Sequence, residues 1–297
     1  MRKTGLLLCA LLATSPALGR PAAPLGRLAV PAAQPFVVVR VNGHALRLKV
    51  DLGAHGSIIL NPQAAARAGL YEDGGVTMRV GPVKLRGSRA SPAFELGDAR
   101  WKGEVMWFDR SYVEDADGVV GPHHLPFEEL EFEGSGQGNY LFSIEAKQSD
   151  DRGVFAPMRV GGKKVAVRFS LLQPRSFATG AAGAVLAKQH NGKLHGSAVQ
   201  QHIGWDISRP TRRLAMAEPW LVGGFRFSEI LVRLRDYRGK SNLPSAETGV
   251  GPTEILVTGR VRGRQGAEHF LTVGLDQLHR CRSVTYSRDA KQLSFRC

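Results

Sequence analysis

Asp51 is a lone carboxylate in a position of this 297-residue chain where an acid or base could act. Asp51 ends a strand-like segment, and Gly53 follows it two residues later, as a tight turn requires. Two carboxylates that share a proton around one water molecule can hydrolyse a peptide bond, one as base and the other as acid. Asp51 could belong to such a pair only if the chain supplies a second acid.

The segment before Asp51 predicts a half-buried strand, because apolar and polar residues alternate along it. Its apolar positions are Leu46, Leu48 and Val50. Asn42 and Gly43 form a hairpin-turn signal ahead of the strand. We therefore expect a hairpin that ends at Asp51.

A second short strand and a helix are expected after Asp51. Residues 58–60 are an apolar run, and Asn61 and Pro62 follow it as a helix cap and a first helical residue. Gly69 is placed to end the helix.

This order resembles the retropepsin-like aspartic protease family, in which an apolar strand ends in Asp-Thr/Ser-Gly-Ala. The motif here is Asp51-Leu52-Gly53-Ala54, so Leu52 replaces the usual hydroxyl residue. The family also has a later apolar pair before a glycine, followed by a leucine, and residues 117–121 with Leu125 resemble it. The resemblance implies two lobes, each of which supplies one catalytic Asp.

A second copy of the segment begins 119 residues later. Residues 160–179 match residues 41–60 without gaps. The matched pairs are Val41 with Val160, Gly43 with Gly162, Leu46 with Val165, Leu48 with Val167, Leu52 with Leu171 and Ser57 with Ser176. Leu96-Gly97 recurs as Val222-Gly223, and Val120-Gly121 recurs as Val273-Gly274. We interpret this as two fused lobes of one fold; the alternative is chance agreement among β-rich segments.

The position matched to Asp51 is Ser170, and Gly53 is matched by Leu172. A serine hydroxyl cannot share a proton with a carboxylate near neutral pH. The site is therefore expected to be catalytically degenerate. Two alternatives stay open: a different second acid, and a homodimer that pairs two copies of Asp51. The candidate acids are Asp206, Asp236 and Asp276.

Composition favours an all-β fold with a few short helices, because glycine and proline punctuate many short β-type runs. With the resemblance, this predicts two tandem retropepsin-like lobes in a bilobal pepsin-like architecture. The expected divisions are a signal peptide (1–19), a flexible Pro/Ala-rich lead (20–34), a first lobe (35–145), a linker (146–152) and a second lobe (153–297).

The first 19 residues have the charged start, apolar run and small-residue cleavage site of a secretory signal. This predicts export, to the periplasm or the medium. The net charge of +14 is concentrated in arginines of the second half. Because no basic motif interleaved with aromatic residues is present, we expect no nucleic-acid partner. An anionic envelope surface remains a candidate partner.

Cys281 and Cys297 are the only cysteines after the signal segment, and export favours a disulfide between them. A turn at residues 288–290 predicts that they face one another across two strands. The alternative is two free thiols. No cofactor or metal is expected, since the pair His123-His124 has no further ligands nearby in the sequence.

Three residues are candidates for substrate contact: Gly53; His55, whose alternative is a surface loop position; and Gly81, at the tip of a hairpin that resembles the family's flap. The first hypothesis is a degenerate peptidase that binds an extended peptide or a protein segment in the cleft between the lobes. The second is an active endopeptidase that pairs Asp51 with an unidentified carboxylate. The third is a binder of anionic envelope components. A monomer is favoured, because the second lobe already occupies the face that a homodimer needs.

Overall fold

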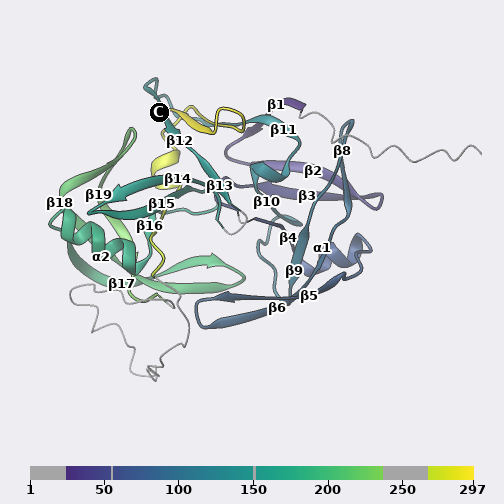
Figure 1. Ribbon diagram of the computed structural model, residues 1–297, viewed down its shortest axis with the longest axis horizontal. Coiled ribbons are helices and arrows are strands. Elements are labelled where there is room, and N and C mark those ends of the chain that lie inside the picture. Colours follow the sequence, from purple (N-terminus) through teal and green to yellow (C-terminus); the bar gives the residue numbers. More distant parts are fainter. Residues whose placement is uncertain (1–24, 55, 150–151, 237–266) are drawn as a thin grey trace, which may run out of the picture.

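The computed structural model describes residues 25–54, 56–149, 152–236 and 267–297. Within these ranges the chain is mostly β-strand with a few short helices, which confirms the predicted class at this level. The strands form three sheets of nine, eight and five members. In Figure 1 the strands of the first half, purple to blue, lie opposite those of the second half, teal to green.

The nine-stranded sheet comes from the first half of the chain. Its strands are β2 (Phe36–Val41), β3 (His44–Val50), β4 (Ile58–Leu60), β5 (Gly74–Val80), β6 (Val83–Ala90), β7 (Ala93–Leu96), β8 (Ala99–Lys102), β9 (Val105–Phe108) and β10 (Gly118–Val120). Helix α1 (Pro62–Arg67) follows β4, and the short 3-10 helix η1 (Pro122–His124) follows β10. The spatial order is β5-β6-β9-β4-β10-β3-β2-β7-β8.

The eight-stranded sheet comes from the second half. Its strands are β13 (Lys147–Ser149), β14 (Gly153–Val160), β15 (Lys163–Phe169), β16 (Phe177–Ala178), β17 (Lys193–Gly204), β18 (Ile207–Val222), β19 (Phe225–Arg233) and β20 (Phe270–Val273). Helix α2 (Gly180–Gln189) follows β16, and α3 (Leu275–Leu278) follows β20. The spatial order is β13-β14-β15-β20-β16-β19-β18-β17.

The two sheets repeat one another in strand order and strand direction, and the pairing of β4 with β9 repeats in register. The series β5-β6-β9-β4-β10-β3-β2 corresponds strand by strand to β17-β18-β19-β16-β20-β15-β14. Ile58 pairs with Val105 in parallel, and their counterparts Phe177 and Leu231 pair in the same way. These pairings occur at the offsets that the sequence comparison predicts for the two copies.

Local turn chemistry explains why both copies begin with the same hairpin. Asn42 and Gly43 have φ values of 50° and 81°, and Gly161 and Gly162 have φ values of 51° and 76°. Two consecutive residues with positive φ form the type I′ turn, whose twist suits a two-residue hairpin. The predicted turn at residues 42–43 is confirmed, and β3 ends at Val50 as expected.

The five-stranded sheet combines strands from both halves. It contains β1 (Leu25–Pro31), β11 (Phe127–Glu133), β12 (Leu141–Glu145), β21 (Ser283–Ser287) and β22 (Gln292–Arg296), in the order β1-β11-β21-β22-β12. The interpretation of residues 20–34 as a flexible lead is wrong for Leu25–Pro31, which pairs in parallel with β11. Residues 147–149 of the expected linker pair with β14 instead of running free. The first segment gains order from a distant partner, and the second from the strand that follows it closely in the sequence.

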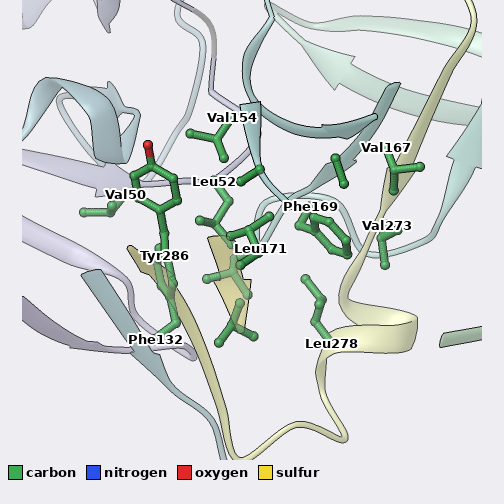
Figure 2. Packing of buried hydrophobic residues seen from close by; sticks show 14 of the residues in the cluster. Val50, Leu52, Phe132, Val154, Val167, Phe169, Leu171, Val273, Leu278 and Tyr286 are labelled. Atoms are coloured by element: carbon green, nitrogen blue, oxygen red, sulfur yellow. The ribbon is translucent and has the colours of Figure 1, made fainter. Parts of the chain in front are cut away.

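One apolar core runs through both halves and under the five-stranded sheet. The cluster includes Leu52 and Leu171, which follow β3 and β15, and Phe132 on β11. Figure 2 shows these side chains among the others of the cluster. Because one continuous core fills this region, the two halves are held together by burial of apolar surface as well as by sheet pairing.

Two local expectations need correction. Asn61 occupies the cap position of α1, but its side chain makes no cap hydrogen bond. It instead donates to the carbonyl oxygens of Val113 and Ala116 and accepts from the backbone N–H of Tyr112. Its amide therefore fastens a distant loop, and α1 begins with Pro62 and without a side-chain cap.

Cys281 and Cys297 form a disulfide, as predicted, but the predicted register is wrong by one residue. Ser287 pairs with Gln292, and the N–H of Lys291 donates to the carbonyl of Arg288, so the turn has four residues. Cys281 lies ahead of β21 and is not a directly opposed strand position. The bond therefore closes the open end of the hairpin.

No helix in the described ranges is long and apolar enough to cross a membrane. Residues 1–19, the expected signal peptide, lie outside the described residues.

Removing the disulfide should destabilise the protein without changing its fold. The two cysteines are 16 residues apart, and closing such a loop contributes about 3 kcal/mol in the chain-entropy treatment. We expect the variant with Cys281→Ser and Cys297→Ser to lose about that free energy of unfolding in urea titrations. Unchanged stability, or two free thiols in the native protein by mass spectrometry, would contradict the assignment.

Candidate functional site

Asp51 and Ser170 occupy equivalent places in the two sheets. The N–H of Asp51, just after β3, donates to the carbonyl of Val120 on β10 at 3.0 Å. The N–H of Ser170, just after β15, donates to the carbonyl of Val273 on β20 at 2.9 Å. In each half the neighbouring parallel strand therefore fixes the end of the strand that presents the residue.

The two residues meet in a buried hydrogen bond. The Ser170 hydroxyl donates to Asp51 Oδ2 at 3.0 Å, and the N–H of Leu171 donates to Asp51 Oδ1 at 2.8 Å. The same hydroxyl accepts from the N–H of Leu172 at 3.2 Å. Both oxygens of Asp51 are thus held by the opposite half, and the matched position offers a hydroxyl in place of a second acid.

Burial dominates the electrostatics of Asp51. Removal from water raises the pKa of its carboxyl from 3.8 to about 6, against the lowering effects of Leu171 N–H, the Ser170 hydroxyl and the Arg168 charge. The carboxyl therefore titrates in the mildly acidic range.

Leu52 and Leu171 are both buried in the common core. These two apolar side chains lie together in the core at the matched positions of the two copies (Figure 2). Ala54 is also buried, and its N–H donates to the carbonyl of Asp51, which closes the turn.

Gly53 lies where the two loops come closest. A Cβ added there would lie 3.0 Å from the carbonyl oxygen of Phe169 and 3.4 Å from the Cβ of Ser170. The glycine thus allows the Asp51 loop to approach the Ser170 loop. The matched residue of the second loop is Leu172, which is half-buried, so the second loop has no glycine at this position.

A cavity of about 550 Å³ opens beside Asp51 and Ser170. Residues of both sheets line it, including Asp51 and Gly53 from one half and Ser170 and Phe177 from the other. Its volume falls in the usual range of ligand pockets, about 300–1,000 Å³. The site that the sequence predicts between the halves is therefore hollow.

The hairpins β5–β6 and β17–β18 point toward one another (Figure 1), and residues of both line the cavity. The tip of β5–β6 is Gly81, with φ of 63°, and the guanidinium of Arg209 on β18 occupies the space where a Gly81 Cβ would stand. Gly81 thus lies at the hairpin tip, as the sequence indicates. The β17–β18 hairpin is a second such element.

Aromatic contacts dock the second hairpin on the first half. The ring of Trp205, at the tip of β17–β18, lies 4.4 Å from that of Tyr112 and 5.7 Å from that of Phe108 between centroids. Asn61 fixes Tyr112 by accepting its N–H at 2.8 Å. Burial, with the Asp51 charge, raises the pKa of the Tyr112 hydroxyl to about 12, so it stays protonated and can donate a hydrogen bond.

None of the alternative acids contacts Asp51. Asp206 is exposed at the tip of the β17–β18 hairpin. Asp236 lines the cavity, but its two oxygens accept the N–H groups of Gly180 and Ala181 at the start of α2. Asp276 accepts from the backbone and hydroxyl of Ser176.

His55 lies outside the described residues, so its contacts are not described. The rings of His123 and His124 lie 4.1 Å apart, and burial, the neighbouring His124 and Arg288 lower the pKa of His123 to about 3. In the described part of the chain no group of three or more His, Cys, Asp or Glu residues is arranged to hold a metal ion.

Sequence reasoning missed the arginines of this cavity. Arg168 on β15 and Arg233 on β19 both line it. Each is a polar position in an alternating strand, the pattern of an ordinary solvent-facing side chain. These two side chains face a cavity because the two halves lie against one another. The sequence of a single strand cannot predict that arrangement.

Comparison with known proteins adds no family. A scan against protein-family models finds no match, and a search of curated proteins finds no significant match. The resemblance to retropepsin-like proteases therefore depends on the motif residues themselves.

Neutralising Asp51 should stabilise the protein more at high pH than at low pH. Because the folded-state pKa is above the unfolded value, the folded state loses stability as pH rises from about 4 through 6. A rise from 3.8 to about 6 corresponds to about 3 kcal/mol when the carboxyl is ionised. Relative to wild type, Asp51→Asn should therefore gain about 2–3 kcal/mol between pH 4 and pH 8 in urea denaturation.

The matched control is Asp98→Asn, which removes the same charge from an exposed turn. A pH dependence for Asp51→Asn no larger than that of the control would show that burial does not raise the pKa of Asp51.

Proposed function

We propose that the protein is an exported, catalytically degenerate member of the aspartic protease fold that binds an extended peptide without cleaving it. In this proposal the two repeated sheets are retropepsin-like lobes in a pepsin-like arrangement. The matching strand orders and the repeated register of the β4–β9 pairing support it. Export follows from the charged and apolar pattern of the first 19 residues.

The observation that carries the proposal is the hydrogen bond from Ser170 to Asp51. An acid dyad works because two neighbouring carboxyls cannot both ionise, so they hold one proton between them. A serine hydroxyl stays protonated throughout the range in which Asp51 titrates. It can orient Asp51 but can neither store nor accept the proton that the reaction moves.

Free strand edges support an extended ligand. In the described part of the chain, β5 ends the nine-stranded sheet and β17 ends the eight-stranded sheet. Residues 77–81 of the β5–β6 hairpin line the cavity, and so does Ile203 of β17. A peptide can add to such an edge through backbone hydrogen bonds, with side chains entering pockets, and no catalytic pair is required.

The test of inactivity is a digest of a broad peptide library between pH 3 and pH 8, read by mass spectrometry. Wild type and Asp51→Asn should give the same background, since Asp51 has no acid partner. Cleavage by wild type that disappears in Asp51→Asn would establish an active aspartic peptidase and overturn the proposal.

The test of binding uses the outward-facing edge of β5. Val80 pairs with Val83 across a two-residue turn, so the alternating ladder turns the N–H of Thr77 away from β6. Thr77→Pro removes this donor and is tolerated in an edge strand. We expect it to weaken retention of library peptides about fivefold, as loss of one hydrogen bond worth about 1 kcal/mol does.

The matched control is Thr77→Ala, which removes the side chain and keeps the N–H. Equal retention by the two variants would show that peptides do not add to β5.

A further inference from the structure

Two arginines of the second half face the cavity from adjoining parts of its wall. Arg168 of β15 lies with its guanidinium 4.7 Å from the ring centre of Phe270, and Arg233 of β19 lies 5.3 Å from that of Phe177. Stacking on a ring orients a guanidinium and leaves its edge N–H groups directed at a ligand. The two arginines are therefore held in place without a carboxylate partner.

Their charges are not neutralised by ion pairs. In the described ranges no carboxylate forms an ion pair within 4 Å of Arg168 or Arg233, and the Nε of each has no hydrogen-bond partner. Burial lowers the pKa of both, and for Arg233 the charges of Arg168 and Arg209 lower it further, to about 10, although Asp236 opposes this. Buried like charges without partners are costly unless an anion joins them.

Two of the three acids of the described lining are hydrogen-bonded elsewhere, and the third, Glu268, attracts both arginines without forming an ion pair with either within 4 Å. Asp51 accepts from Ser170 and Leu171, and Asp236 accepts from the first N–H groups of α2. A ligand carboxylate in the cavity could therefore form the direct ion pair that neither arginine has in the described ranges.

We propose that Arg168 and Arg233 form a subsite for a carboxylate of the bound peptide, so that the natural ligands are acidic peptides. The inference depends on the proposed peptide-binding function and names its ligand class. The carboxylate is either a Glu or Asp side chain or the peptide's C-terminus. Both present two coplanar oxygens, which suit the planar fork of a guanidinium.

The summed charge of the described lining side chains favours a carboxylate over a phosphate. The described lining contains four arginines, at positions 79, 168, 209 and 233, and three acids, at positions 51, 236 and 268. One positive charge remains when all are ionised. A carboxylate carries one negative charge and balances it, whereas a phosphate carries nearly two near neutral pH.

The experiment uses three pools of random octapeptides with the purified mature protein. The first pool has a fixed central Glu and an amidated C-terminus, the second a central Gln and an amidated C-terminus, and the third a central Gln and a free C-terminus. Retained peptides are quantified by mass spectrometry. We expect at least one of the two carboxylate-bearing pools to be retained about tenfold over the amidated Gln pool, the factor that a charge-assisted hydrogen bond supplies.

A preference for the first pool assigns the subsite to an acidic side chain, and a preference for the third assigns it to the C-terminus. The preference should disappear in the double variant Arg168→Gln with Arg233→Gln. It should persist in Arg226→Gln, which removes an exposed arginine from the same strand β19.

Equal retention of all three pools by wild type overturns the inference and leaves peptide binding intact. A preference for a carboxylate-bearing pool that persists in the double variant also overturns the inference. Retention of none of the pools overturns both the inference and the proposed function. The comparison among pools on wild type needs no variant, so it holds even where the double variant does not fold.

Discussion

The buried contact between the loops that follow β3 and β15 is the constraint on which the site depends. Asp51 is removed from water, and its oxygens are held by the hydroxyl of Ser170 and the N–H of Leu171 from the opposite half. A buried carboxylate without these donors would be strongly destabilising. The sequence of the Ser170 loop and the protonation of Asp51 are therefore linked, and Gly53 permits the close approach that both need.

The contact between the two loops does not depend on a second carboxylate. The apolar pair Leu52 and Leu171 keeps the loops in the common core. The strands β10 and β20 hold the two strand ends in matching hydrogen bonds. None of these interactions needs a second carboxylate, so the two loops stay in contact with a serine at position 170.

Much of the fold was predictable because its signals are local or repeated. The turn at Asn42-Gly43 depends only on neighbouring residues, and the match between residues 41–60 and 160–179 shows the same local pattern twice. The observed pairings of Ile58 with Val105 and of Phe177 with Leu231 follow the predicted offsets.

The strand Leu25–Pro31 was not predictable, because its partner β11 lies about a hundred residues away and its composition is that of a loop. The predicted register of the hairpin that the disulfide closes was wrong by one residue, because the length of a turn cannot be read from the sequence Arg-Asp-Ala at residues 288–290. At the site, Asp51 and Ser170 were found by alignment of the copies, whereas Arg168 was missed because its inward direction is a property of the assembled halves.

The most direct test of the claim that Asp51 is a single acid with Ser170 as its partner is to titrate its side chain. The titration is monitored by NMR of the side-chain carboxyl carbon in ¹³C-labelled protein from pH 3 to pH 8. The Asp51 resonance is assigned by its absence in Asp51→Asn. A single step with a midpoint near pH 6 is expected, because burial raises the pKa and no second carboxyl shares the proton. Two linked steps, shared with the resonance of another carboxyl, would reveal a dyad and contradict the assignment of Ser170 as the partner.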